Sequence, residues 1–214
     1  HSGFFAQPRE INFENLSITN GLPALSISCI LQDKEGFLWI ATEGDGLLRF
    51  DGHNYKIFKY SPDEGSISNN TVTCLYQDSK GTLWAGTFDG LNKYDKENES
   101  FLAYKHDNSF NSLSDNVINC IHEDREGMLW IGTGSGLNSF NGERFNLFKN
   151  NPNDSNSLIN DDIRCIYEDI NSMLWVGTNN GLTKFDKTNK FVHFKNDKKN
   201  NNTISSNIIR DIHQ

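Results

Sequence analysis

The sequence predicts an all-β protein in which one unit of about 45 residues occurs four times. The tryptophans of the chain follow one another at intervals of 45, 46 and 45 residues, and the cysteines keep the same intervals. These residues are Trp39, Trp84, Trp130 and Trp175, with Cys29, Cys74, Cys120 and Cys165. Each unit contains four short apolar or aromatic runs separated by turn residues. No segment of helical length shows an apolar period of 3.6 residues.

The first unit shows how the four strands are defined. Apolar residues 27–32 are followed by 38–42 around Trp39, by 47–50 and by the aromatic segment 55–60. Gly, Asn and Asp occupy the segments between them, as in the turns of antiparallel strands. Each unit is therefore predicted to be a four-stranded antiparallel meander. The four units span residues 27–60, 72–105, 117–149 and 163–195.

Four such sheets need one another, because a single sheet of this kind cannot bury both of its apolar faces. We expect them to stack face to face, about 10 Å apart. Radial stacking gives the blades of a β-propeller, of which this chain would hold about four complete ones. Exposed blade faces and edge strands would favour self-association of the chain.

The two ends of the chain are interpreted by their spacing from the repeats. Residues 10–15 are expected to form an orphan outer strand, and residues 208–214 the first strand of a fifth blade. A partial propeller would then span residues 10–214. Residues 1–9 are interpreted as a tag or signal-peptide remnant and a flexible start.

Composition argues against several partners. A formal charge of -8 does not favour nucleic acid, and no apolar run reaches the roughly 18 residues of a membrane span. We therefore expect this chain to contact neither nucleic acid nor a membrane. No CxxC pair or histidine cluster indicates a metal, and no cofactor is expected. The cysteines occupy one position in neighbouring sheets, too far apart for disulfides, and are predicted to be free, buried thiols.

The central motif is Asp-x-x-Gly-x-Leu-Trp-Ile-Gly-Thr-x-x-Gly-Leu, followed by Tyr or Phe and Asp. Its copies lie at residues 33–47, 78–91, 124–137 and 169–182. This motif resembles the two-component regulator propeller repeat. Ala41 departs from the usual glycine, and Ser172 replaces the glycine of the first turn. We expect Asn171 to take over the positive φ angle of that turn.

The resemblance implies the extracytoplasmic sensor of a hybrid two-component system, of the kind found in Bacteroides-like gut bacteria that sense glycan breakdown products. It further implies a parent with two tandem seven-bladed propellers, a small β-sandwich, a membrane helix, a histidine kinase, a receiver and a DNA-binding regulator. This chain would be the N-terminal piece, located in the periplasm. It would bind an oligosaccharide, contact the remaining blades and have no catalytic activity. A propeller enzyme, such as a lyase or glycosidase, and a protein-interaction scaffold are the alternatives.

The candidate site residues fall into three groups. The aspartates that open the motif are interpreted as turn caps, because equivalent positions of successive blades are too far apart to act as paired carboxylates. They are Asp33, Asp78, Asp124 and Asp169.

Ligands of propellers bind where loops converge at the mouth of the channel, and two sets of variable positions could meet there. One set lies in the turns between second and third strands: Glu43, Asp45, Phe88, Asp89, Ser135, Asn179 and Asn180. The other set is the polar residue before each cysteine position: Ser28, Thr73, Asn119, Arg164 and Arg210. Solvent-exposed turns without a ligand are the alternative interpretation.

Overall fold

The computed structural model describes residues 22, 26–107, 109, 111–188 and 190–213. All of the regular structure in these residues is β-strand, arranged in four sheets of four strands. The strands are β1 Ile27–Gln32, β2 Leu38–Thr42, β3 Leu47–Phe50, β4 Tyr55–Phe58, β5 Val72–Gln77, β6 Leu83–Thr87, β7 Gly90–Asp95, β8 Ser100–Tyr104, β9 Ile118–Glu123, β10 Leu129–Thr133, β11 Gly136–Phe140, β12 Phe145–Phe148, β13 Ile163–Glu168, β14 Leu174–Thr178, β15 Gly181–Phe185 and β16 Phe191–Phe194.

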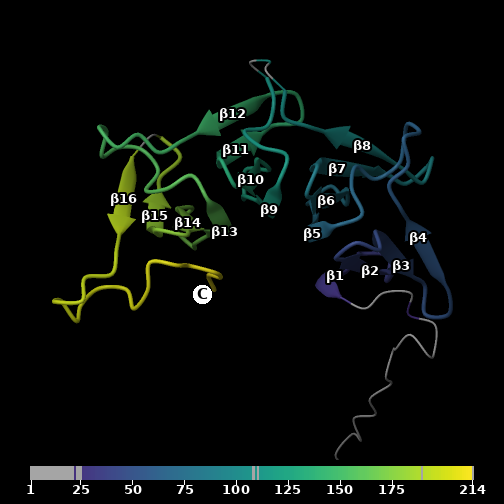
Figure 1. Cartoon of the computed structure of the whole chain (residues 1–214), viewed down its shortest axis with the longest axis horizontal. Helices are drawn as coiled ribbons and strands as arrows, with labels where there is room; N and C mark the ends of the chain where they lie inside the picture. Colours follow the sequence, from purple (N-terminus) through teal and green to yellow (C-terminus); the bar gives the residue numbers. More distant parts are fainter. Residues whose placement is uncertain (1–21, 23–25, 108, 110, 189, 214) are drawn as a thin grey trace, which may run out of the picture.

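Each sheet is an antiparallel meander, and the four sheets follow one another around an arc (Figure 1). The first strands of the sheets, β1, β5, β9 and β13, lie on the concave side of the arc, and the fourth strands lie on the convex rim. Successive first strands contact one another. This arrangement confirms the predicted propeller blades. The strands begin and end within two residues of the predicted units.

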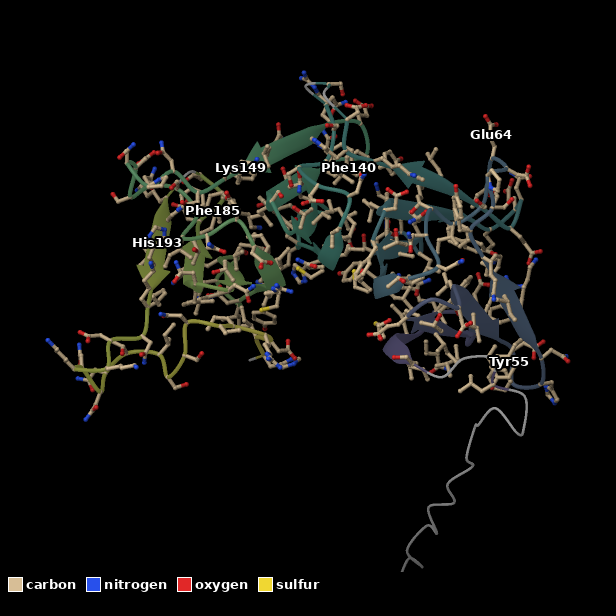
Figure 2. All side chains as sticks on the ribbon, in the orientation of Figure 1. Tyr55, Glu64, Phe140, Lys149, Phe185 and His193 are labelled. Carbon is tan, nitrogen blue, oxygen red and sulfur yellow. The ribbon has the colours of Figure 1, made fainter. Side chains whose placement is uncertain are left out.

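The hydrophobic core lies between the blades. One cluster of buried residues, including Trp39 and Tyr94, joins blades one and two. Equivalent clusters join blades two and three and blades three and four. Figure 2 shows Phe140 and Phe185 inside these packed layers. Burial of aromatic rings between neighbouring sheets is therefore what holds the arc together.

The aspartate that opens each motif has two structural tasks. In the first blade, Asp33 Oδ1 accepts hydrogen bonds from the backbone N–H groups of Glu35 and Phe37 at 2.9 and 3.0 Å. Its Oδ2 accepts a bond from the indole Nε1–H of Trp39 at 2.7 Å. The same indole bond occurs in the other blades, at 2.8–2.9 Å, in Trp84–Asp78, Trp130–Asp124 and Trp175–Asp169. Turn capping is confirmed, and the bond to the tryptophan is an addition that spacing alone did not reveal.

The expectation for the first turn of the fourth blade is wrong. Ser172 itself takes the positive φ angle, 60°, and Asn171 does not. The reason lies in the turn's hydrogen bond: Ser172 N donates to Asp169 O at 3.0 Å, as Gly36 N donates to Asp33 O. Because this bond fixes the backbone at the fourth turn position, the residue there must adopt the left-handed conformation.

The glycine of the Trp-Ile-Gly-Thr segment is needed where the next blade packs. A Cβ atom on Gly132 would lie 2.5 Å from Cys120 Sγ and 2.7 Å from Ile163 Cγ2 of the next blade. Gly86 and Gly177 have matching surroundings. In the first blade, Ala41 stands at this position, and the next blade offers the smaller Val72 in place of isoleucine. Valine keeps the Cβ and Cγ atoms that approach the glycine in the other blades, so the structure gives no reason why the methyl group is tolerated here.

The described cysteines are free, as expected. Cys165 is buried, but Cys29, Cys74 and Cys120 are only half-buried, so the prediction of complete burial is wrong for these three. Burial nevertheless raises the pKa of the Cys74 thiol to about 12 and that of Cys165 to about 11. Both thiols are therefore protonated at neutral pH.

The chain beyond the fourth blade packs on that blade. Ile209 N donates a hydrogen bond to Thr178 O at 3.0 Å, and the Ile209 side chain lies against Gly177. Residues 208–213 are not assigned to a strand, since no described strand pairs with them. The fifth-blade strand stays a prediction. The expected segments 1–9 and 10–15 lie outside the described residues.

Charged side chains reinforce two of the three blade junctions. Between blades one and two, Glu99 pairs with Arg49 at 2.8 Å and also with Lys56, and Lys96 pairs with Glu35. Between blades three and four, Lys187 Nζ lies 3.0 Å from Asp124 Oδ2, and Arg125 pairs with Glu168 at 3.9 Å. Among the described residues, no ion pair joins blade two to blade three. That junction retains hydrogen bonds, such as Ser79 N to Glu123 Oε2 at 2.6 Å.

Lys187 is the least exposed cation of this set, with its side chain 13% exposed. Its ammonium lies between Asp124 and Glu168, 2.6 Å from Glu168 Oε1, and the two carboxylate side chains are 1% and 4% exposed. Desolvation opposes ionisation of Asp124, but hydrogen bonds from Trp130, Met128 and Lys187 outweigh it, so the pKa of Asp124 is lowered. Desolvation likewise opposes the charge on Lys187, and the two carboxylates outweigh it and raise the pKa of Lys187.

The packing at the motif glycine predicts the effect of one added methyl group. Gly132→Ala should lower the free energy of unfolding by about 2 kcal/mol, because Ile163 or Cys120 must move. The control is Gly134→Ala in the following turn, where the nearest atom to the new Cβ is 3.5 Å away. Urea denaturation measures both. Equal stability of the two variants would contradict the close-packing argument.

The contact of Lys187 with two buried carboxylates predicts a pH-dependent loss of stability. Lys187→Met leaves Asp124 and Glu168 without their cation and should cost about 3 kcal/mol at pH 7. Because the folded-state pKa of Asp124 is lowered, its stabilising contribution is present above pH 3.8 and is lost as the pH falls through the folded value. The difference between the variant and the parent chain should therefore narrow in acid.

The matched control for this experiment is Lys190→Met, an exposed lysine near the same turn. Urea titrations at pH 7 and near pH 3 compare the three proteins. A constant deficit for Lys187→Met across this range would show that the ion pairs are not its cause.

Candidate functional site

The turns between second and third strands and the loops that lead into the first strands meet at the same end of the blades. Backbone hydrogen bonds join them: Phe88 N donates to Thr71 O at 3.2 Å, and Gly90 N donates to Asn116 O at 2.8 Å. In blade four, Asn179 N donates to Asp162 O at 3.2 Å. We call this end, formed by turns 43–46, 88–89, 134–135 and 179–180 with these loops, the mouth end. The turn residues predicted as ligand candidates lie on it.

A hollow of about 470 Å³ opens at the mouth end between blades one and two. We call it the mouth hollow. Its lining residues are Ser28, Glu43, Thr71, Val72, Thr73 and Phe88. They come from both predicted sets, the turn residues and the residues before the cysteines. The Phe88 side chain is 54% exposed, an unusual position for a large apolar ring. The mouth hollow is therefore the candidate ligand site.

Two predicted acidic residues of the mouth end are already paired. Asp89 lies 2.6 Å from the ammonium of Lys105, and Asp45 lies 3.9 Å from that of Lys59. Each lysine directly follows the fourth strand of its own blade. Each of these carboxylates is therefore already in an ion pair without any ligand. Neither of them lines the mouth hollow.

The predicted residues of blades three and four lie elsewhere on the mouth end. Ser135 donates to Asp115 Oδ2 at 2.7 Å, and Asp162 binds both Asn179 and, at 2.8 Å, Arg164. Two further candidates stand apart. Asn180 lines a separate hollow of about 440 Å³ with His193 and Lys195, and Arg210 is exposed. The structure therefore does not bring all of the candidates to one site.

The residues before the cysteines serve mainly to join the blades. A β-bulge at this point of each first strand re-aims the side chain. Ser28 donates to Val72 O, Thr73 donates to Ile118 O at 2.5 Å, and Asn119 donates to Ile163 O at 2.8 Å. Each acceptor belongs to the next blade. Arg164 leaves this series and pairs with Asp162 of its own blade instead.

Sequence reasoning missed Thr71 and a second, larger hollow. Thr71 reaches the mouth hollow because its backbone pairs with Glu43 in an isolated β-bridge. The larger hollow, about 660 Å³, lies at the opposite end of blades one and two and includes Arg49. The guanidinium lies 4.9 Å from the ring of Phe37 and bonds to Tyr94 Oη at 3.0 Å. Because ion pairs of the blade junction cross this hollow, we assign it to the scaffold.

Metal chemistry and membrane spanning have no candidate in the part of the chain that the structure describes. No three His, Cys, Asp or Glu side chains converge there as a metal site. None of these residues belongs to a helix long and apolar enough to cross a membrane.

Comparison with known families follows the repeat pattern. Residues 21–44, 66–89, 112–135 and 157–180 each match the family described as two component regulator propeller. The chain carries four two-component regulator propeller repeats. Each matched segment runs from the loop before a blade to the turn after its second strand. The mouth hollow is built from parts of two such repeats.

Individual relatives share parts of these repeats. A region of 61 residues is 39% identical to histidine kinase P4 of Formosa agariphila and covers 28% of this chain but 4% of that protein. The extracellular domain of a proposed hybrid two-component system from B. thetaiotaomicron is similar in structure, with a TM-score of 0.63 and 23% identity. The likeness covers 94% of this chain and 39% of that domain.

The two-component regulator propeller repeats also share their fold with an enzyme. Virginiamycin B lyase from Staphylococcus aureus has a TM-score of 0.60 and 16% identity, over 81% of this chain and 56% of the lyase. At this identity the likeness concerns the propeller fold alone. This chain spans less than two thirds of the length of each of these three relatives.

Proposed function

We propose that this chain is an extracytoplasmic sensor propeller of a hybrid two-component system and that it binds oligosaccharides in the mouth hollow. The observation that carries the proposal is the mouth hollow itself, set in a chain of two-component regulator propeller repeats. Ligand binding there would be transmitted to a histidine kinase and a transcriptional regulator in the parent protein.

The chemistry of the mouth hollow suits a sugar. The ring of Phe88 offers an apolar face on which the C–H groups of a pyranose can pack, and aromatic rings provide large contact areas. Glu43 and the hydroxyl groups of Thr71 and Thr73 provide acceptors for sugar hydroxyl groups. A volume of about 470 Å³ lies within the range of small-molecule sites.

The proposal also covers the cellular location of the propeller and the protein surfaces that it contacts. The likeness to an extracellular domain supports a periplasmic location, and the remaining blades of the parent would be its neighbours. We also propose that copies of the chain associate with one another through the face of blade one that turns away from blade two. Ile30 on that face is 55% exposed, and Tyr55 lies beside its buried cluster.

The arrangement supports binding rather than catalysis as the role of this chain. Glycoside hydrolysis uses two carboxyl groups on either side of the bond that is cleaved. Glu43 is the one carboxylate among the residues that line the mouth hollow, and Asp45 and Asp89 have lysine partners. We therefore place this chain among the sensors and not among the propeller lyases or glycosidases.

The proposed site predicts that binding depends on one aromatic ring. Phe88→Ala should weaken binding of an oligosaccharide about tenfold, because the ring supplies the stacking face. Titration calorimetry against a panel of oligosaccharides, followed by the variant with each ligand that binds, measures the change. Leu102→Ala is the control, since Leu102 is similarly exposed, at 56%, on outer strand β8.

Two outcomes would contradict the proposal. Undiminished binding by Phe88→Ala would place the ligand elsewhere on the propeller. Cleavage of a saccharide by the parent chain, lost in Glu43→Gln, would favour the enzyme.

A further inference from the structure

We infer that the mouth hollow selects saccharides that carry a protonated amine, such as 2-amino sugars with a free amino group. This inference rests on the proposed function and names its ligand class. It is carried by the pairing of Glu43 with Phe88 across the junction of blades one and two.

The mouth hollow has a carboxylate and no cation of its own. Glu43 is the one charged residue among those that line it. Lys59 and Lys105, which follow the fourth strands of blades one and two, are paired with Asp45 and Asp89 of the turns. A bound ammonium would therefore meet an uncompensated negative charge, whereas a bound carboxylate or sulfate would be repelled.

Glu43 is held in position for such a ligand. Its backbone N–H donates to Ser26 O at 3.1 Å, and it forms a β-bridge with Thr71. Its Oε2 accepts a hydrogen bond from Ser26 Oγ at 2.9 Å. Among the described residues, no hydrogen bond or ion pair to Oε1 is found. One oxygen of this exposed carboxylate is thus hydrogen-bonded to the protein, and the other is available to a ligand.

Phe88 supplies the second half of the recognition. The face of an aromatic ring attracts a cation, and a carboxylate nearby adds the attraction of opposite charges. The exposed ring of Phe88 lines the same hollow as Glu43. An amino sugar can pack its C–H face on the ring while its ammonium meets the carboxylate.

The repeat pattern shows that this pairing belongs to one junction. Glu43 and Phe88 occupy the same position, directly after the threonine of the motif, in blades one and two. The equivalent residues in blades three and four are Gly134 and Asn179. The junction between blades two and three therefore pairs a ring with glycine, and the next pairs glycine with an amide. Of these three junctions, only the first combines a carboxylate with an aromatic ring.

The test compares two ligands that differ in the charge on nitrogen. Titration calorimetry of the chain with glucosamine trimer and with N-acetylglucosamine trimer, at pH 6 and low salt, should show the free amine bound about tenfold more tightly. In Glu43→Gln the two trimers should bind alike. Glu64→Gln is the control, because Glu64 is an exposed carboxylate on the outer rim, away from the mouth hollow (Figure 2).

Equal or tighter binding of the N-acetylated trimer would overturn the inference, as would a preference for the amine that survives in Glu43→Gln. Binding of neutral or acidic oligosaccharides that depends on Phe88, without binding of the amine, would overturn the inference and leave the proposed function standing. No binding of any oligosaccharide would overturn both.

Discussion

The hydrogen bond from the motif tryptophan to its aspartate is the interaction on which the rest of this structure depends. In the first blade, one carboxylate closes the turn before β2 through two backbone N–H groups and fixes the indole of Trp39. The fixed indole then packs edge-on against Tyr94 of the next blade, with ring centres 5.0 Å apart. A polar contact inside one blade thereby sets the position of the apolar contact between two blades.

Much of the fold could be predicted, because regular spacing reports directly on strands and turns. The positions of β2, β6, β10 and β14 follow from the tryptophan interval alone. The spacing could not show which way individual side chains point or which residue of a turn takes the positive φ angle. The bulge that turns Thr73 toward Ile118 O, and the positive φ angle of Ser172 rather than Asn171, arise from backbone hydrogen bonding.

The sequence predicted that a candidate site would lie at the variable turns, but not which residues would line it together. Variation among otherwise uniform turns pointed to Glu43 and Phe88, and the structure places both on one hollow. Asp45 and Asp89 instead form ion pairs with lysines, and Asn180 lines a different hollow. These partners come from segments about 15 residues away or from neighbouring blades, so a pattern within one turn carries no information about them. The repeat thus provides a constant frame, and specificity resides in a few residues at one junction.

Ion pairs are distributed unequally along the arc, and they differ in burial from one blade junction to the next. Blades one and two, and blades three and four, are each tied by charged side chains, and the Lys187 contact is buried. Blades two and three share an apolar core and hydrogen bonds, without an ion pair among the described residues. Exposed ion pairs add little stability, but a buried charge cannot be pulled from its partners without a large penalty. Bending of the arc would therefore meet its largest electrostatic resistance at the junction of blades three and four, away from the mouth hollow between blades one and two.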